Sequence, residues 1–197
     1  MKNRIFKNLT TTKEQGHLLK FLRTAIIAGL IAVLAFPDEG MAFNYFRHRP
    51  YRLTANSAIL WDPARNCRYF ELGADRQVFP ASTTKVLTAI LVLEKLSLDQ
   101  YVTVSVRATQ VPQTKLGLKP GESYRVRDLL YGLILKSAND AAVVLAEAVG
   151  GTQEKFVDMM NARARLMGAT HSHFANPHGL PSSGTQFTTA ADMALIF

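Results

Sequence analysis

The chain has 197 residues, a formal net charge of +8 and an apolar content of 48%. This length and composition suit a single domain with a sizeable core and exclude a disordered chain. The basic residues are scattered without interleaved aromatic residues, so the positive charge gives no support for nucleic-acid binding. Because Cys67 is the only cysteine, an intrachain disulfide and a cysteine-rich metal site are excluded.

The N-terminal residues have the order of an export signal. Residues 1–24 carry six basic side chains and one acidic one, and an apolar run of twelve residues follows from Ala25 to Phe36. Twelve helical residues span only about 18 Å, which is short of the ~30 Å hydrocarbon core of a bilayer. We therefore predict that residues 1–42 are a signal peptide and that the protein is exported to the periplasm or cell envelope. An uncleaved anchor with membrane association is the alternative.

A polar, aromatic connector over residues 43–52 leads into two strand patterns, residues 54–61 and 67–72. Pro63 and Asn66, between the two strands, favour a turn, so we expect a β-hairpin. In this hairpin Cys67 is interpreted as a strand residue rather than a reactive thiol.

Ser82 opens the central helix pattern of the chain, in the run Pro80-Ala81-Ser82-Thr83-Thr84-Lys85. Residues 86–96 are so uniformly apolar that a helix there would lie inside the protein. A spacing of three puts the Ser82 hydroxyl and the Lys85 amine on one helix face, where burial lowers the pKa of the amine enough for it to take a proton from serine. The S-x-x-K pattern alone is weak, because serine is also an ordinary helix N-cap and lysine an ordinary surface residue.

The rest of the chain alternates between strand, loop and helix patterns. A strand is expected over residues 101–106, and the glycine- and proline-rich residues 111–125 are expected to run over the surface. One helical pattern begins at Val126, a second covers residues 141–149, and a third follows a cap at Thr152.

His171, His173 and His178 lie within eight residues of one another and suggest a zinc site. No carboxylate or cysteine stands at a supporting spacing, and Asn176-Pro177 forces a turn between the histidines. We therefore expect no metal site.

The polar triplet Ser137-Ala138-Asn139 lies between two apolar helices. Its side chains must either cap helices or face a cleft, because they cannot remain unpaired in a core. Capping is the simpler alternative, with Asn139 as the N-cap of the second helix.

Five motifs occur in one order along the chain. They are Pro80-Ala81-Ser82-Thr83-Thr84-Lys85, Leu118-Lys119-Pro120-Gly121-Glu122, Asp128-Leu129-Leu130, Ser137-Ala138-Asn139-Asp140-Ala141-Ala142 and Asn176-Pro177-His178-Gly179-Leu180. From about residue 53 onward the sequence thereby resembles the serine D-alanyl-D-alanine carboxypeptidases, which are low-molecular-mass penicillin-binding proteins. S-x-x-K with Ser-x-Asn is typical of these penicilloyl serine transferases. The resemblance implies an α+β, β-lactamase/transpeptidase-like fold, with a helical subdomain around a buried central helix and an antiparallel sheet.

The resemblance also implies roles for four residues. Ser82 would be the nucleophile that attacks the carbonyl between the two D-alanines of a peptidoglycan pentapeptide, and Lys85 would be its base. Ser137 would relay protons to the leaving amine, and Asn139 would position the substrate amide and the lysine. No cofactor is implied, and β-lactam antibiotics should acylate the same serine.

The chain departs from the family pattern in one respect, because Lys-Thr-Gly, the motif on the opposite wall of the family's cleft, occurs nowhere in it. We therefore expect residues 53–197 to be a partial catalytic domain without its C-terminal strands, with unpaired sheet edges and one face of the central helix uncovered. A last helix is predicted from the capping box Thr189-Ala190-Ala191-Asp192, and it reaches Phe197 without a C-cap. The expectation is a truncated chain that is inactive alone.

Two other functions fit part of the pattern. A serine β-lactamase shares both motifs but needs a group that activates water, and Glu147 and Glu154 fall on or beside helices without such a setting. A non-catalytic envelope protein that binds peptidoglycan or a partner through the uncovered face is the second alternative.

Overall fold

The structure is a computed structural model that describes residues 53–182 and 185–197. Helices form its core. The helices are η1 (Ala81–Thr83), α3 (Thr84–Lys95), α4 (Val106–Thr109), α5 (Val126–Leu135), α6 (Asn139–Gly150), α7 (Gln153–Leu166) and α8 (Ala190–Ile196). The strands are β1 (Ala58–Asp62), β2 (Cys67–Leu72), β3 (Tyr101–Thr103) and β4 (Ser123–Arg125). The predicted export segment, residues 1–42, and the connector, residues 43–52, lie outside the described residues.

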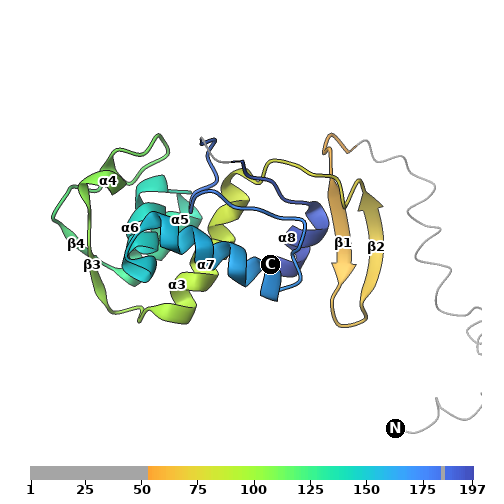
Figure 1. Cartoon of the computed structure of the whole chain (residues 1–197), viewed down its shortest axis with the longest axis horizontal. Helices are drawn as coiled ribbons and strands as arrows, with labels where there is room; N and C mark the ends of the chain where they lie inside the picture. The colour runs from red at the N-terminus through yellow and green to blue at the C-terminus, as the bar shows by residue number, and fades with distance from the viewer. Residues whose placement is uncertain (1–52, 183–184) are drawn as a thin grey trace, which may run out of the picture. The chain divides into compact units, whose positions relative to one another are not determined.

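The central helix α3 lies among helices α5, α6 and α7 (Figure 1). It contributes to two clusters of buried side chains. Ala89 and Val92 pack with residues of α5, α6 and β3, whereas Leu87 and Leu91 pack with residues of α7 and α8. A helix with apolar residues on nearly every side can bury two faces in this way. The predicted burial of this helix is thereby confirmed for most of its length.

One stripe of α3 is less covered than the rest. Val86 and Ile90 are half-buried, and Leu93 is 57% exposed. These residues recur at helical spacing, so they lie on one face. Val86 and Ile90 still pack against the second cluster, whereas Leu93 is open to solvent.

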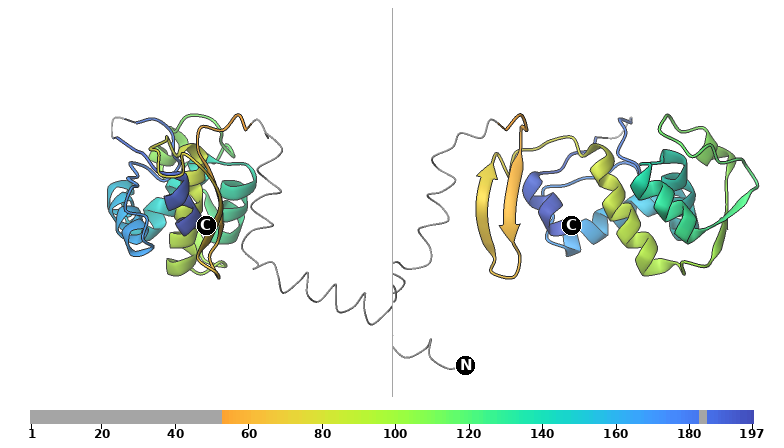
Figure 2. Two further views of the ribbon diagram at one scale, coloured as in Figure 1. Left: turned by 90° about the vertical axis from the view of Figure 1, so that its right-hand side faces the viewer. Right: turned by 180° about the vertical axis from the view of Figure 1, so that it is seen from behind.

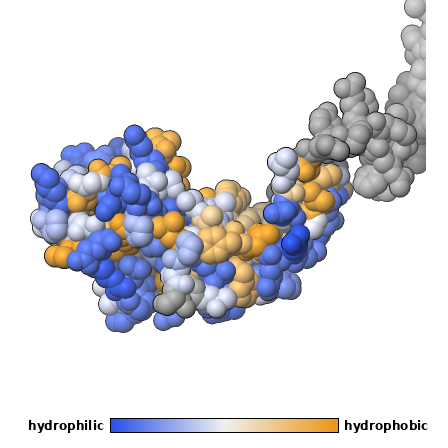
Figure 3. All heavy atoms as spheres, turned by 90° about the horizontal axis from the view of Figure 1, so that it is seen from above, coloured by the Kyte–Doolittle hydropathy of each residue, from blue (hydrophilic) through white to orange (hydrophobic). Residues whose placement is uncertain are grey.

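The predicted hairpin is present as the antiparallel pair β1 and β2, which lies beside α8 (Figure 2). Asp62 closes its turn by accepting hydrogen bonds from the backbone N–H groups of Ala64 and Arg65. Cys67 is a half-buried strand residue, as expected. Leu60 and Phe70 stand opposite each other in this pair and are both exposed. Figure 3 shows apolar residues at the surface of the protein.

The sequence-based assignment of residues 101–125 was partly wrong. The strand predicted over residues 101–106 ends at Thr103, because Ser105 accepts a hydrogen bond from Ala108 N and so begins helix α4. The segment expected to be surface loop contains β4, which pairs antiparallel with β3. Three-residue strands depend on such pairing and carry little periodicity of their own.

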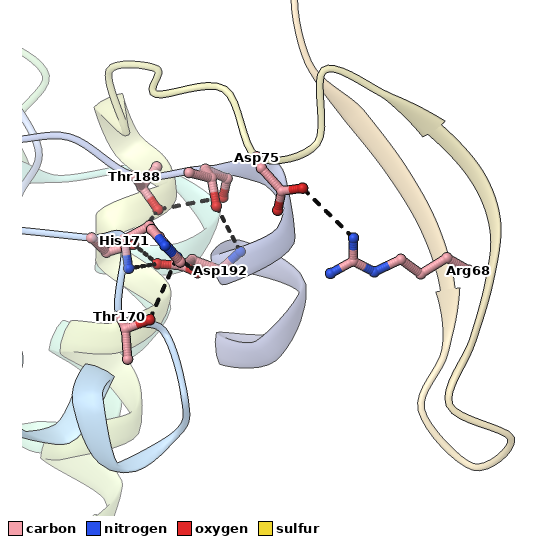
Figure 4. A network of polar contacts seen from close by, with 8 residues as sticks. Arg68, Asp75, Thr170, His171, Thr188 and Asp192 are labelled. Atoms are coloured by element: carbon pink, nitrogen blue, oxygen red, sulfur yellow. Dashed lines mark hydrogen bonds and ion pairs between the residues drawn. The ribbon is translucent and has the colours of Figure 1, made fainter.

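The buried carboxylate of Asp192 joins helix α8 to the segment before it (Figure 4). It accepts hydrogen bonds from His171 N and from Ser172 Oγ, each at 2.7 Å. Thr189 caps the same helix by accepting from Asp192 N, so the predicted cap is confirmed. The reciprocal half of the predicted capping box is replaced by the hydrogen bonds that Asp192 accepts from residues 171 and 172.

Residues 53–182 and 185–197 contain no helix that is both long and apolar enough to span a membrane.

We predict that Asp192→Ala lowers the free energy of unfolding by about 2 kcal/mol, because His171 N–H and Ser172 O–H lose their buried acceptor. Denaturant unfolding monitored by circular dichroism measures the change. Asp158→Ala, which removes an exposed carboxylate on α7, is the matched control and should change stability by less than about 0.5 kcal/mol. Equal losses in both variants would contradict the assigned role of Asp192.

Candidate active site

The hydroxyl of Ser82 is the point where three side chains meet. Ser82 lies in η1, immediately before α3, and its Oγ is 3.2 Å from Lys85 Nζ. Ser137, between α5 and α6, donates to the same oxygen at 3.0 Å. Pro80 and Thr83 occupy the N-cap positions of η1 and α3, so the alternative that Ser82 is an ordinary cap is wrong.

Lys85 is buried, with 3% of its surface exposed. Burial disfavours the ammonium form and lowers its pKa to about 8. Its Nζ also donates to the backbone carbonyl of His178 at 2.9 Å. The amine is therefore held against the serine and is neutral in a large fraction of molecules at mildly alkaline pH.

Ser137 has a left-handed backbone, with φ +54°. That conformation is uncommon for residues other than glycine and is found at functional sites. It turns the chain between the end of α5 and the start of α6, and Ala138 N donates to Gly132 O within this turn. The serine hydroxyl reaches Ser82 from this turn.

Asn139 is the first residue of α6, and Ala138 is the N-cap, so the capping alternative for Asn139 is wrong. Its buried Nδ2 donates to Pro112 O at 3.1 Å and to Gln113 O at 2.9 Å. Two carbonyl acceptors fix which end of the amide is nitrogen. Within the described part of the chain Oδ1 has no partner, so Asn139 makes no hydrogen bond to Lys85, and Oδ1 is left as an acceptor.

Asp140 was not predicted to be a site residue, although it follows Asn139 directly. Its carboxylate accepts hydrogen bonds from the backbone N–H groups of Leu116, Gly117 and Leu118, at 3.0 to 3.2 Å. Together, residues 139 and 140 hold the segment 112–118 against the start of α6. The sequence signal that could have identified Asp140 is its place as an acidic residue in the first turn of a predicted helix, after a glycine-containing loop.

The three histidines of the zinc alternative have separate surroundings. His171 lies 3.8 Å from Asp192, His173 packs near Phe187, and His178 is buried beside Lys85. Burial, and to a smaller extent the charge of Lys85, lowers the pKa of His178 to about 4. The His178 ring is therefore neutral at neutral pH.

Gly179 lies directly against the segment that carries Ser82. A Cβ at this position would stand 1.7 Å from Ala81 O and 2.8 Å from Thr84 Oγ1, and φ is +80°. Only glycine fits such a close backbone approach without displacing Ala81 and Thr84.

Known proteins match most of the chain. A family model described as D-alanyl-D-alanine carboxypeptidase, peptidase family S11, matches residues 44–197. The D-alanyl-D-alanine carboxypeptidase DacC of Escherichia coli K12 is 40% identical over 186 residues, which are 89% of this chain and 46% of the relative. DacB2 of Mycobacterium tuberculosis is 45% identical over 128 residues, 64% of this chain and 44% of the relative. The chain spans about half the length of these curated relatives.

Solved structures of carboxypeptidases and penicillin-binding proteins also match the chain. The D-alanyl-D-alanine carboxypeptidase DacD from Francisella tularensis matches with a TM-score of 0.72 and 36% identity, over 84% of this chain and 40% of that chain. Penicillin-Binding Protein D2 from Listeria monocytogenes in the ampicillin-bound form matches with a TM-score of 0.66 and 28% identity, over 76% and 62% of the two chains. The predicted α+β, transpeptidase-like fold is confirmed.

We predict that Gly179→Ala destabilises the protein far more than Gly151→Ala, although both glycines have positive φ. No atom lies within 4 Å of a Cβ at Gly151, so only the cost of a left-handed alanine, about 1 to 2 kcal/mol, is expected there. Overpacking against Ala81 should add roughly 1 to 3 kcal/mol at Gly179. Denaturant unfolding compares the two variants, and equal losses would contradict the close approach.

Because the pKa of His178 is about 4 when folded and about 6.5 when unfolded, the unfolded chain binds the proton first on acidification. We predict that this difference removes roughly 2 to 3 kcal/mol of stability between pH 6.5 and 4.5. Replacing His178 by Asn, which keeps an acceptor near Leu180 N, should make that loss smaller by the same amount. Unfolding curves at both pH values test it; an unchanged pH dependence in His178→Asn would contradict the assignment.

Proposed function

The chain belongs to the D-alanyl-D-alanine carboxypeptidase family, and on that basis we propose that its site performs serine carboxypeptidase chemistry on peptidoglycan pentapeptides through an acyl-enzyme on Ser82. The observation that carries this proposal is the convergence of Lys85 Nζ and Ser137 Oγ on Ser82 Oγ. A hydroxyl in contact with a buried amine of lowered pKa has the arrangement of an activated nucleophile.

In the proposed acylation Ser82 Oγ attacks the carbonyl carbon between the two D-alanines, and its proton passes to neutral Lys85. The N–H of Ser82, at the start of the helical segment, would stabilise the developing oxyanion, where one such donor is worth roughly 3 to 4 kcal/mol. The C–N bond then breaks, and Ser137 passes a proton from Lys85 to the leaving D-alanine amine. Water hydrolyses the remaining ester, which restores the Ser82 hydroxyl and releases the shortened peptide.

The positions of the glutamates favour a carboxypeptidase over a β-lactamase. Glu147 lies eight residues beyond Asn139 in α6, which is about 12 Å along the helix axis. Glu154 is paired with Arg107 at 2.7 Å on the protein surface. Neither carboxylate is placed beside Ser82 to activate a deacylating water.

The missing Lys-Thr-Gly motif bears on the activity of this chain alone. In the family that motif lines the other wall of the cleft, and no such tripeptide occurs in the 197 residues. We therefore predict that the chain alone does not hydrolyse D-alanyl-D-alanine peptides. A strained β-lactam ring is a more reactive acyl donor, so it is the better probe of Ser82.

The cellular setting is part of the proposal. A peptidoglycan substrate requires export to the periplasm or cell envelope, and the basic and apolar order of residues 1–42 supports such export. Membrane association through the apolar segment would follow if that segment were retained.

We predict that benzylpenicillin forms an adduct on Ser82 that adds the mass of one intact penicillin, because ring opening loses no atoms. The rate should rise through a pH of about 8 as Lys85 becomes neutral. Lys85→Arg, which stays protonated, should slow the reaction by at least ~100-fold. Intact-mass and peptide mass spectrometry measure the adduct.

Ser82→Ala is the control and should form no adduct. An adduct on another residue, or an equal yield in Ser82→Ala, would contradict the proposed function and favour the non-catalytic envelope protein. Rapid turnover of the penicillin without a persistent adduct would favour the β-lactamase.

A further inference from the structure

The turn Asn176–Leu180 is a motif of the sequence to which the proposed chemistry assigns no role. Three successive residues of this turn contact the nucleophile-bearing face of η1 and α3. Pro177 O accepts from Thr88 Oγ1 at 2.7 Å, His178 O accepts from Lys85 Nζ at 2.9 Å, and Gly179 packs on Ala81. The turn therefore contacts residues about one helical turn before and one helical turn after Lys85.

The side chain of Asn176 gives the turn its shape. Its Oδ1 accepts from Gly179 N at 2.7 Å and from His178 N at 3.2 Å, and its Nδ2 donates to Leu180 O at 2.8 Å. Only 3% of Asn176 is exposed. Asparagine often stabilises a turn by such bonds to its own backbone, and here the bonds fix the direction of the peptide group that carries His178 O.

His178 O supplies an acceptor that Lys85 needs inside the protein. A buried ammonium without hydrogen-bond partners would cost several kcal/mol. His178, which is buried beside Lys85, is held neutral by burial and by the lysine's charge. The carboxylate of Asp140 on α6 binds the loop 116–118 instead of the lysine. No carboxylate within the described ranges forms an ion pair with Lys85, so the carbonyl and Ser82 Oγ determine its position.

We propose that Asn176 is a positioning residue for the base, because it fixes the carbonyl that holds Lys85 Nζ toward Ser82 and closes the turn over that amine. The proposal rests on the proposed function, since it gives Asn176 a part in the same acylation. Asn176 itself does not touch the reacting atoms: all three of its polar contacts are to the turn.

The test compares Asn176→Ala with Asn161→Ala in the full chain. Asn161 is also a buried asparagine with three hydrogen bonds to backbone groups, but it links α7 to Phe174 and does not contact the turn. Both variants should lose stability. Only Asn176→Ala should admit water to Lys85 and raise the midpoint of its titration, followed by NMR of its ε-methylene group, by at least ~1 pH unit.

The second measurement is acylation by benzylpenicillin at pH 8. Asn176→Ala should be slower than the unmodified chain by at least ~10-fold, because fewer molecules hold a neutral, correctly placed lysine. Asn176→Ser keeps one acceptor for the turn and should restore part of both the rate and the midpoint. It also serves as the test variant if Asn176→Ala does not fold.

The outcomes separate this inference from the proposed function. An unchanged Lys85 midpoint in folded Asn176→Ala or Asn176→Ser, or an equal shift in Asn161→Ala, overturns the positioning role even if Ser82 is acylated. A shift confined to the Asn176 variants supports the role even if the unmodified chain forms no adduct, in which case only the proposed function fails.

Discussion

The structure depends on one buried amine. Lys85 lies in a helix whose faces are mostly covered by other helices, and it is held between Ser82 Oγ and His178 O. Burial makes the amine a usable base, because a surface lysine would remain protonated at neutral pH. The same burial requires that every donor of the lysine find an acceptor, and this requirement explains why the surrounding turns are so closely fitted.

Two sets of polar side chains fix the segments around Ser82 and Lys85. In the first set Asn139 and Asp140 bind the segment 112–118 by side-chain hydrogen bonds to its backbone, and so support the turn that carries Ser137. In the second Asn176 shapes the turn that carries His178 O. None of these three side chains needs to react. Their effect is to fix the backbone around Ser82 and Lys85, the residues of the proposed reaction.

Local spacing explains which parts of the site could be predicted from the sequence. Ser82 and Lys85 are three residues apart, so a helix alone fixes their distance, whereas Ser137 is 55 residues away and could be assigned only through the family resemblance. The acceptor at His178 is a backbone carbonyl 93 residues from Lys85, and a carbonyl has no sequence signature. Similarly, β4 was missed because it forms only through pairing with β3. The hairpin and the capped helices were predicted because their turn and cap residues act locally.

The central claim is that burial brings Lys85 into a range where it can act as a base. Titration of Lys85 in the unmodified chain, followed by NMR of its ε-methylene group, tests this without depending on turnover. The account predicts a midpoint near pH 8, well below the ordinary lysine value of about 10.4. A midpoint above about 10 would show that the amine remains protonated at the pH of the proposed reaction, and would contradict the account.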